Sequence, residues 1–81
     1  MKGKMKYSVK TLREVGLEAR WTHNRSGAPI IIARDPSSRN FHQRETWWHV
    51  TNGMWKDMQS AGIKEAFDQH TLLGDIFSVA L

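Results

Sequence analysis

Arginine, tryptophan and histidine side chains between positions 20 and 49 are the residues whose chemistry suits binding. A guanidinium group engages phosphate or carboxylate oxygens through paired hydrogen bonds, and a nucleobase stacks on an indole ring. Tryptophan and arginine are also common energetic anchors of protein interfaces. We therefore predict a binding surface for nucleic acid or for an acidic protein surface, formed by Arg20, Arg25, Arg34, Arg39, His42, Arg44, Trp47 and His49.

Positive charge is concentrated in the amino-terminal half of the chain. Residues 1–44 hold ten Lys and Arg against three acidic residues, whereas residues 45–81 hold two against five. The net charge of +4 is thus a +7 half joined to a −3 half. This asymmetry attracts a polyanion over about a Debye length of 8 Å. It slightly favours a polyanion but does not say whether the partner is RNA, DNA or an acidic protein.

The histidines and glycines are the residues that could form a metal, cofactor or catalytic motif. The four histidines show no spacing typical of a metal site, and the chain has no cysteine, which excludes disulfides and thiolate ligands. We expect no metal and no cofactor. No phosphate-binding glycine loop or nucleophile motif is present. A non-enzymatic protein is therefore the preferred prediction.

A small ribonuclease is the minor alternative. Glu45 and His49 would share one face of a strand, where they could act as an acid–base pair with Arg20 or Arg44. His70 lies on the apolar side of a predicted helix and is expected to be a hydrogen-bonded core histidine.

Chain length and apolar patterning predict one small domain over residues 8–81, preceded by a flexible basic tail over residues 1–7. The longest apolar run, at 30–33, is too short for a membrane span. We expect a cytoplasmic protein without a membrane partner. The four tryptophans are expected mainly in the core, so an exposed one would be informative. Residues 72–81 are apolar enough to be buried or to form a homodimer.

Two helices carry start and stop signals. Ser8 and Thr51 suit N-caps, and Gly16 and Gly62 suit left-handed helix ends, which predicts helices at about 8–15 and 52–61. A third helical pattern follows Gly62. The competing prediction is one long helix through this glycine.

Strand patterns fill the middle of the chain. Alternation over 17–22, a β-branched run over 29–33 and an aromatic run over 46–50 predict three strands. The predicted fold class is α+β, an α-β-β-β-α-(α) order with a three-stranded antiparallel sheet and helices packed on one face. A four-residue turn at 24–27 would place Trp21 opposite Ile30 and Arg20 opposite Ile31.

That register predicts the composition of the two sheet faces. One face would hold Ala19, Trp21, Ile30, Ile32, Trp48 and Val50 against the helices. The other face would combine Arg20, Ile31, Trp47 and His49, with Thr22 and Ala33 beside them and with Arg25 and Arg34 at its ends. The basic loop from Arg34 to Arg44 is the second candidate binding element.

The element order over residues 8–61 resembles that of double-stranded-RNA-binding domains. The stretch Leu12-Arg13-Glu14-Val15-Gly16-Leu17 before a basic hairpin is also similar to small toxin ribonucleases of the HicA kind. The chain departs from both families. Lys56 alone represents the lysine cluster of the first, and Ser26-Gly27-Ala28-Pro29 replaces the Gly-Ser-His-His stretch of the second. A resemblance in element order implies a fold and not a function.

Two functional hypotheses follow from these patterns. The first is nucleic-acid binding through the basic hairpin, the basic loop and the aromatic sheet face. The second is a protein-binding regulator or inhibitor of a host enzyme or complex, of the kind that phages and mobile elements encode.

Overall fold

A computed structural model describes residues 8–72. Within this part of the chain, three strands form an antiparallel sheet in the order β1-β2-β3: β1 is Glu18–His23, β2 is Pro29–Arg34 and β3 is Trp48–His49. The predicted α+β class and its three-stranded antiparallel sheet are confirmed. The third strand is shorter than the expected 46–50.

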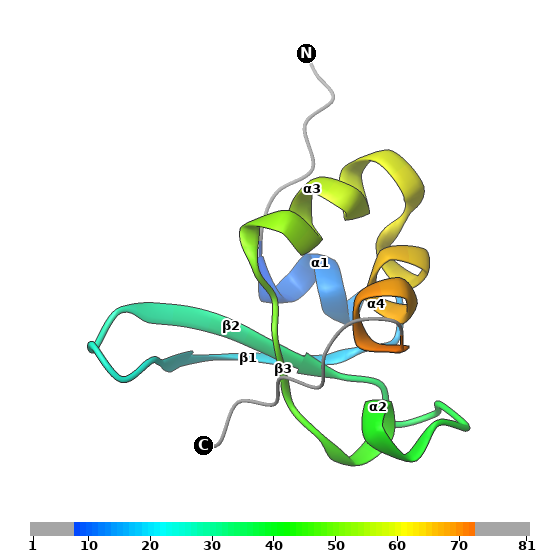
Figure 1. Ribbon diagram of the computed structural model, residues 1–81, viewed down its shortest axis with the longest axis horizontal. Coiled ribbons are helices and arrows are strands. Elements are labelled where there is room, and N and C mark those ends of the chain that lie inside the picture. The colour runs from blue at the N-terminus through cyan, green and yellow to red at the C-terminus, as the bar shows by residue number, and fades with distance from the viewer. Residues whose placement is uncertain (1–7, 73–81) are drawn as a thin grey trace.

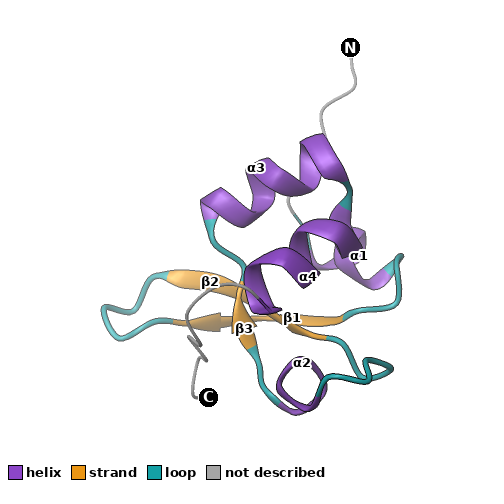
Figure 2. Ribbon diagram, turned by 45° about the vertical axis from the view of Figure 1, so that its right-hand side comes forward, coloured by secondary structure: helices purple, strands orange, loops and turns teal. Residues whose placement is uncertain are grey.

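Helices lie on both sides of this sheet. α1 (Val9–Arg13), α3 (Asn52–Ala61) and α4 (Ile63–Leu72) lie above it in the view of Figure 1. The short α2 (Phe41–Glu45) lies below it, and Figure 2 shows the same separation. α2 was not predicted, and it occupies part of what was expected to be a basic loop.

The predicted helix caps explain where the helices begin and end. The Ser8 hydroxyl accepts a hydrogen bond from the amide of Thr11 at 3.2 Å, and the Thr51 hydroxyl accepts one from the amide of Met54 at 3.2 Å. Gly62 has a φ of 104° and ends α3, so the single long helix through this position is wrong. A residue with a side chain is strained at such a φ, which is why glycine stands there.

The register of the hairpin differs from the prediction by one residue. Trp21 lies opposite Ile31, Ala19 opposite Ala33 and Arg20 opposite Ile32. The cause is a five-residue connection, in which the Asn24 amide donates to the Ala28 carbonyl at 2.9 Å. The Asn24 side-chain oxygen also accepts from the amides of Ser26 and Ala28. The longer loop leaves the faces of β1 unchanged and exchanges those of β2.

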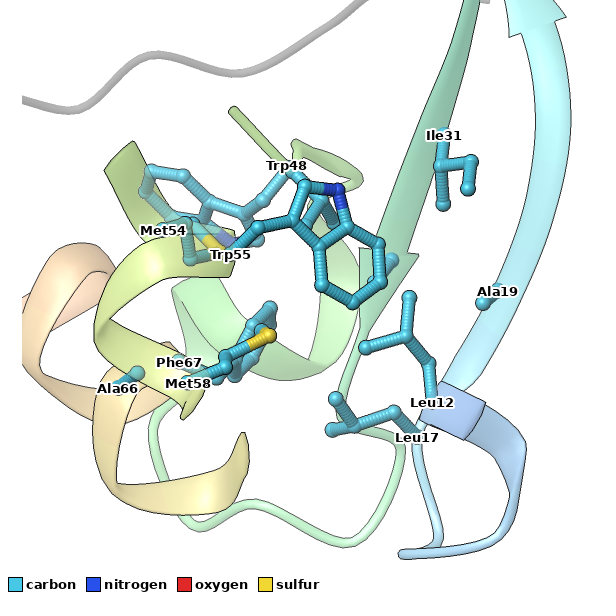
Figure 3. Close-up of a cluster of buried hydrophobic side chains, with 12 residues drawn as sticks. Leu12, Leu17, Ala19, Ile31, Trp48, Met54, Trp55, Met58, Ala66 and Phe67 are labelled. Carbon is cyan, nitrogen blue, oxygen red and sulfur yellow. The ribbon is translucent and has the colours of Figure 1, made fainter. Parts of the chain in front are cut away.

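The core lies between the sheet and the helices above it (Figure 3). It includes Ile31 and Ala33, which the predicted register had placed on the opposite face; that expectation is wrong. Trp48 and Val50 are buried on the core side as expected. The other members of the cluster are Leu12, Leu17, Ala19, Met54, Trp55, Met58, Ala66 and Phe67.

Two of the predictions fall on residues that the structure does not describe. The basic tail over 1–7 lies outside the described residues, as does the proposed dimer segment over 72–81 apart from Leu72. The side chain of Leu72 is exposed. In the described part of the chain, no helix has the length and apolar character needed to cross a membrane.

Candidate functional site

The indole ring of Trp47 lies against two arginine side chains on the sheet face that the core helices do not cover. The Cζ atom of Arg20 is 4.9 Å from the ring centroid, and that of Arg34 is 4.7 Å from it. Arg20 comes from β1, Arg34 from the end of β2 and Trp47 from the residue before β3. Cation–π attraction at these distances holds both guanidinium groups in place.

Ile32 is the apolar base of this cluster. It has no exposed surface, yet it does not belong to the core cluster on the helix side. Its direct neighbours across the sheet are Arg20 and His49, and Arg34 is two residues along the same strand. Because the ring of Trp47 contacts both arginines, we infer that it lies across Ile32. This face therefore has a small apolar patch of its own, formed by Ile32 and Trp47, and the arginines lie at the rim of the patch.

Acidic residues neutralise this face only in part. Glu18 pairs with Arg34, and the Glu45 carboxylate accepts from Nε of Arg44 at 3.1 Å. Arg20, Arg25 and Arg39 are exposed, and none of them forms an ion pair with an acid among residues 8–72. Guanidinium groups without a carboxylate partner are available to an anionic ligand.

α2 adds an exposed aromatic side chain on the same side of the sheet. Phe41 is 62% exposed, and the Cζ atom of Arg44 is 5.6 Å from its ring centroid. The ring of His42 meets the Phe41 ring edge-on at 5.9 Å. The amides of His42 and Gln43 donate to the side chain of Asn40, which caps the helix.

A buried polar network attaches α2 and the preceding loop to α4. The side-chain nitrogen of Gln43, Nε2, donates to the Asp68 carboxylate at 2.9 Å and to the Thr71 hydroxyl at 2.7 Å. The Gln43 side-chain oxygen accepts from Ser38 at 2.6 Å. These bonds hold the segment that carries Arg39 and Arg44 against the helical layer.

Asp35 is the second anchor of this segment. It is buried at the end of β2, where it pairs with Lys64 of α4 and accepts from the amide and hydroxyl of Ser37. Burial raises the pKa of Asp35, but the hydrogen bonds and charge of Lys64, with help from Ser37, outweigh it and leave the pKa below its ordinary value. The carboxylate is therefore charged at neutral pH.

The structure brings four of the eight predicted binding residues to one face of the sheet. Arg20, Arg34 and Trp47 are in direct contact, and His49 lies one residue pair away beside Ile32. The remaining members lie on adjoining elements: Arg39 in the loop before α2, His42 and Arg44 on α2, and Arg25 at the exposed end of the hairpin.

The expected acid–base pair is not supported by the element assignment. Glu45 belongs to α2, where its carboxylate binds the neighbouring Arg44, and does not share a strand with His49. His70 is half-buried, and its Nε2 atom is 2.7 Å from the Asp57 carboxylate. In the described ranges, no three His, Asp or Glu side chains converge as they would to hold a metal ion.

Sequence reasoning missed two exposed aromatic residues. Trp21 is 58% exposed at the hairpin end, and Phe41 is exposed on α2. Asn40 followed three residues later by Gln43 is a helix-start pattern that could have revealed α2. No local pattern distinguishes Trp21 from a core tryptophan, because its exposure depends on where the helices end.

Comparisons with protein-family models, with curated proteins and with solved structures found no match for this chain.

Proposed function

We propose that this protein binds nucleic acid through the arginine face, defined as Arg20, Arg34, Arg39, Arg44, Trp47 and His49. The observation that carries the proposal is the contact of two guanidinium groups with one indole ring, at 4.9 and 4.7 Å. Trp47 acts here as a support for Arg20 and Arg34 rather than as the ring on which bases stack. Arginines held in place lose less conformational entropy when they bind phosphate.

The charge distribution supports a polyanionic ligand. The sheet side and its adjoining elements hold Arg20, Arg25, Arg34, Arg39 and Arg44 with only Glu18 and Glu45 as acidic partners. The helices above the sheet carry most of the remaining acids of the described chain. A surface of this kind attracts phosphate backbones and gives binding that weakens as salt rises.

The test is an anisotropy titration of the full chain with labelled 20-mers of single-stranded RNA, single-stranded DNA and duplex DNA between 50 and 300 mM salt. The variant is Arg20→Ala/Arg39→Ala, which removes two exposed cations of the arginine face. The matched control is Lys10→Ala/Lys56→Ala, which removes two exposed cations from α1 and α3.

The arginine variant should make the negative slope of log affinity against log salt shallower by about 1.4 for single strands, because each lost phosphate contact removes about 0.7. The lysine variant should leave the slope near that of the unmodified chain. No binding by the unmodified chain at 50 mM salt, or equal losses in both variants, would overturn the proposal.

An acidic protein surface is the second candidate partner, because the same exposed arginines and aromatic rings serve protein interfaces. This candidate predicts a stoichiometric protein retained from lysate in nuclease-treated buffer. It also predicts that the retained protein is lost in Arg20→Ala/Arg39→Ala and kept in Lys10→Ala/Lys56→Ala.

A further inference from the structure

A groove of about 520 Å³ lies at the edge of the sheet, next to the arginine face. Its lining residues include Trp21, Ile31, His49, Val50, Asn52 and Trp55. Ile31, Val50 and Trp55 are buried and form an apolar floor, whereas the indole of Trp21 is 58% exposed and forms a wall. The groove thus combines an open aromatic face with a closed apolar base.

The shortness of β3 creates this groove. β3 pairs only with Ile32 and Ala33, and the chain then turns at Thr51 into α3. Within residues 8–72, the chain beside β3 reaches the first half of β2 only through the hydrogen bond from the Val50 amide to the Ile31 carbonyl, at 2.9 Å. Figure 1 shows the hairpin extending beyond the helical layer, and Trp21, opposite Ile31, is 58% exposed.

His49 connects the groove to the arginine face. Its position opposite Ile32 places it in the same row as Arg20, and its side chain also lines the groove. Neighbouring strands are about 4.8 Å apart, so Arg20 and His49 are separated by roughly 10 Å across the sheet. A backbone bound along the arginines therefore reaches the groove within one or two nucleotides.

We propose that this groove takes an unpaired nucleobase and makes the protein selective for single-stranded nucleic acid. This inference rests on the proposed function. The base stacks on the exposed indole of Trp21, while His49 and Asn52 supply donors and acceptors for its edge. A base within a duplex is paired and stacked, and extruding it costs free energy. Single strands therefore gain the stacking contact and duplexes do not.

The charge next to the groove favours this occupant over an apolar peptide. Arg25, in the hairpin loop after Trp21, and Arg20, on the opposite face of the same strand, form no ion pair with an acid among residues 8–72. A strand that passes from the arginine face to the groove therefore meets cations that suit its phosphates.

The experiment compares the unmodified chain with Trp21→Ala and Trp21→Phe in anisotropy titrations at one salt concentration. The probes are a 12-mer single strand, the duplex of the same sequence and a 12-mer abasic strand that keeps the phosphates. Trp21→Ala should weaken binding of the intact strand about ten-fold. The duplex and abasic strand should bind both chains equally, and Trp21→Phe should keep most of the affinity.

Tryptophan fluorescence supplies a second readout, because Trp48 and Trp55 are buried and Trp21 is the most exposed of the four. The intact strand should quench the emission of the unmodified chain, and the abasic strand should quench it much less. Urea unfolding of each variant shows whether the fold is kept. If Trp21→Ala does not fold, the difference in quenching between the intact and the abasic strand tests the groove in the unmodified chain, and equal quenching by the two strands would overturn it.

The outcomes separate this inference from the function on which it rests. Absence of binding to every probe overturns the proposed function. If Trp21→Ala binds the strand, the duplex and the abasic probe with the same loss of affinity, or with no loss, the groove assignment is overturned. The arginine face then remains the proposed binding surface. Unchanged strand binding together with loss of a stoichiometric protein partner assigns the groove to a protein instead.

Discussion

Individual side chains on the arginine face serve both the fold and the binding surface. Trp47 contacts Arg20 and Arg34, and we infer that it covers Ile32, which has no exposed surface. Trp21 has the same side chain but lies at the uncovered hairpin end. The two tryptophans should therefore contribute differently to stability and to binding.

Trp47→Ala should lower the free energy of unfolding by about 2 kcal/mol, because it uncovers Ile32 and removes two cation–π contacts. Trp21→Ala should lower it by less than about 1 kcal/mol, because much of that ring is already in water. Equilibrium urea unfolding of both variants measures the difference. Equal losses would contradict the assignment of Trp47 as a cover for Ile32.

The ion pair between Asp35 and Lys64 predicts a specific acid dependence of stability. Since the pKa of Asp35 is lowered by folding, its contribution is present above its unfolded pKa of about 3.9 and is lost as pH falls through the lower folded pKa. Stability should therefore decline below about pH 4. Asp35→Asn should lower the free energy of unfolding at pH 7 by about 2 kcal/mol.

Urea unfolding at pH values from 2 to 7 tests this dependence. The difference in stability between the unmodified chain and Asp35→Asn should shrink as the pH falls below 4. Glu45→Gln is the matched control, because its carboxylate is half exposed and binds the adjacent Arg44. A difference that stays constant over the whole range would contradict the expectation.

At the scale of the elements, helix ends follow local rules and the sheet does not. Thr51 and Gly62 bound α3 where the sequence predicted. The register of β2, by contrast, follows from the length of the hairpin loop, which the Asn24 side chain sets through bonds to Ser26 and Ala28. Local patterns predict such loops poorly, because four- and five-residue connections use the same residue types.

Gly62→Ala and Gly53→Ala form a matched pair for the helix boundary. A Cβ at position 62 would lie 2.5 Å from Oε1 of Glu65 and on a backbone with a φ of 104°. A Cβ at position 53 would meet only the Thr51 hydroxyl oxygen, at 3.9 Å. We expect Gly62→Ala to destabilise the protein by about 1–2 kcal/mol.

Gly53→Ala should be neutral or stabilise the protein by up to about 1 kcal/mol, because alanine is the better residue within a helix. Thermal or urea unfolding measures both variants. If the two substitutions changed the free energy of unfolding in the same direction and by the same amount, the boundary between α3 and α4 would not depend on the left-handed conformation at Gly62.

At the scale of the whole molecule, a helical layer covers only part of one sheet face. α1, α3 and α4 cover the sheet near Ala19 and Ala33, whereas the hairpin end extends past them (Figure 1). The proposed binding surface uses what is left open: the arginine face on one side, and the groove beside Trp21 at the edge.

Amide hydrogen exchange should show this difference in cover. The pairs Thr22–Ile30 and Arg20–Ile32 occupy equivalent positions in the β1–β2 ladder, two residues apart. Ile32 has no exposed surface, whereas Thr22 and Ile30 are partly exposed. Amide exchange followed by NMR should be at least about ten-fold faster at Thr22 and Ile30 than at Arg20 and Ile32, because local opening at the first pair exposes less apolar surface. Equal protection would contradict this picture.

Local sequence patterns were enough to predict the α+β class, the helix caps, the end of α3 at Gly62 and the core side of Trp48 and Val50. They also identified Arg20, Trp47 and His49 as one side of the sheet. These features depend on periodicity and on residues within a few positions of one another, and short-range sterics and hydrogen bonds decide them.

Long-range packing, by contrast, selects the face of β2 that joins the core, the tryptophan that is exposed and the place where α2 attaches. Ile31 and Ile32 are equally apolar, so the loop at Asn24 and pairing with β1 select between them. Trp21 is open because the helices end before the hairpin does, and α2 is held by bonds from Gln43 to residues 25 and 28 positions away. Contacts at that separation are set by the packed chain as a whole, and no local pattern encodes them.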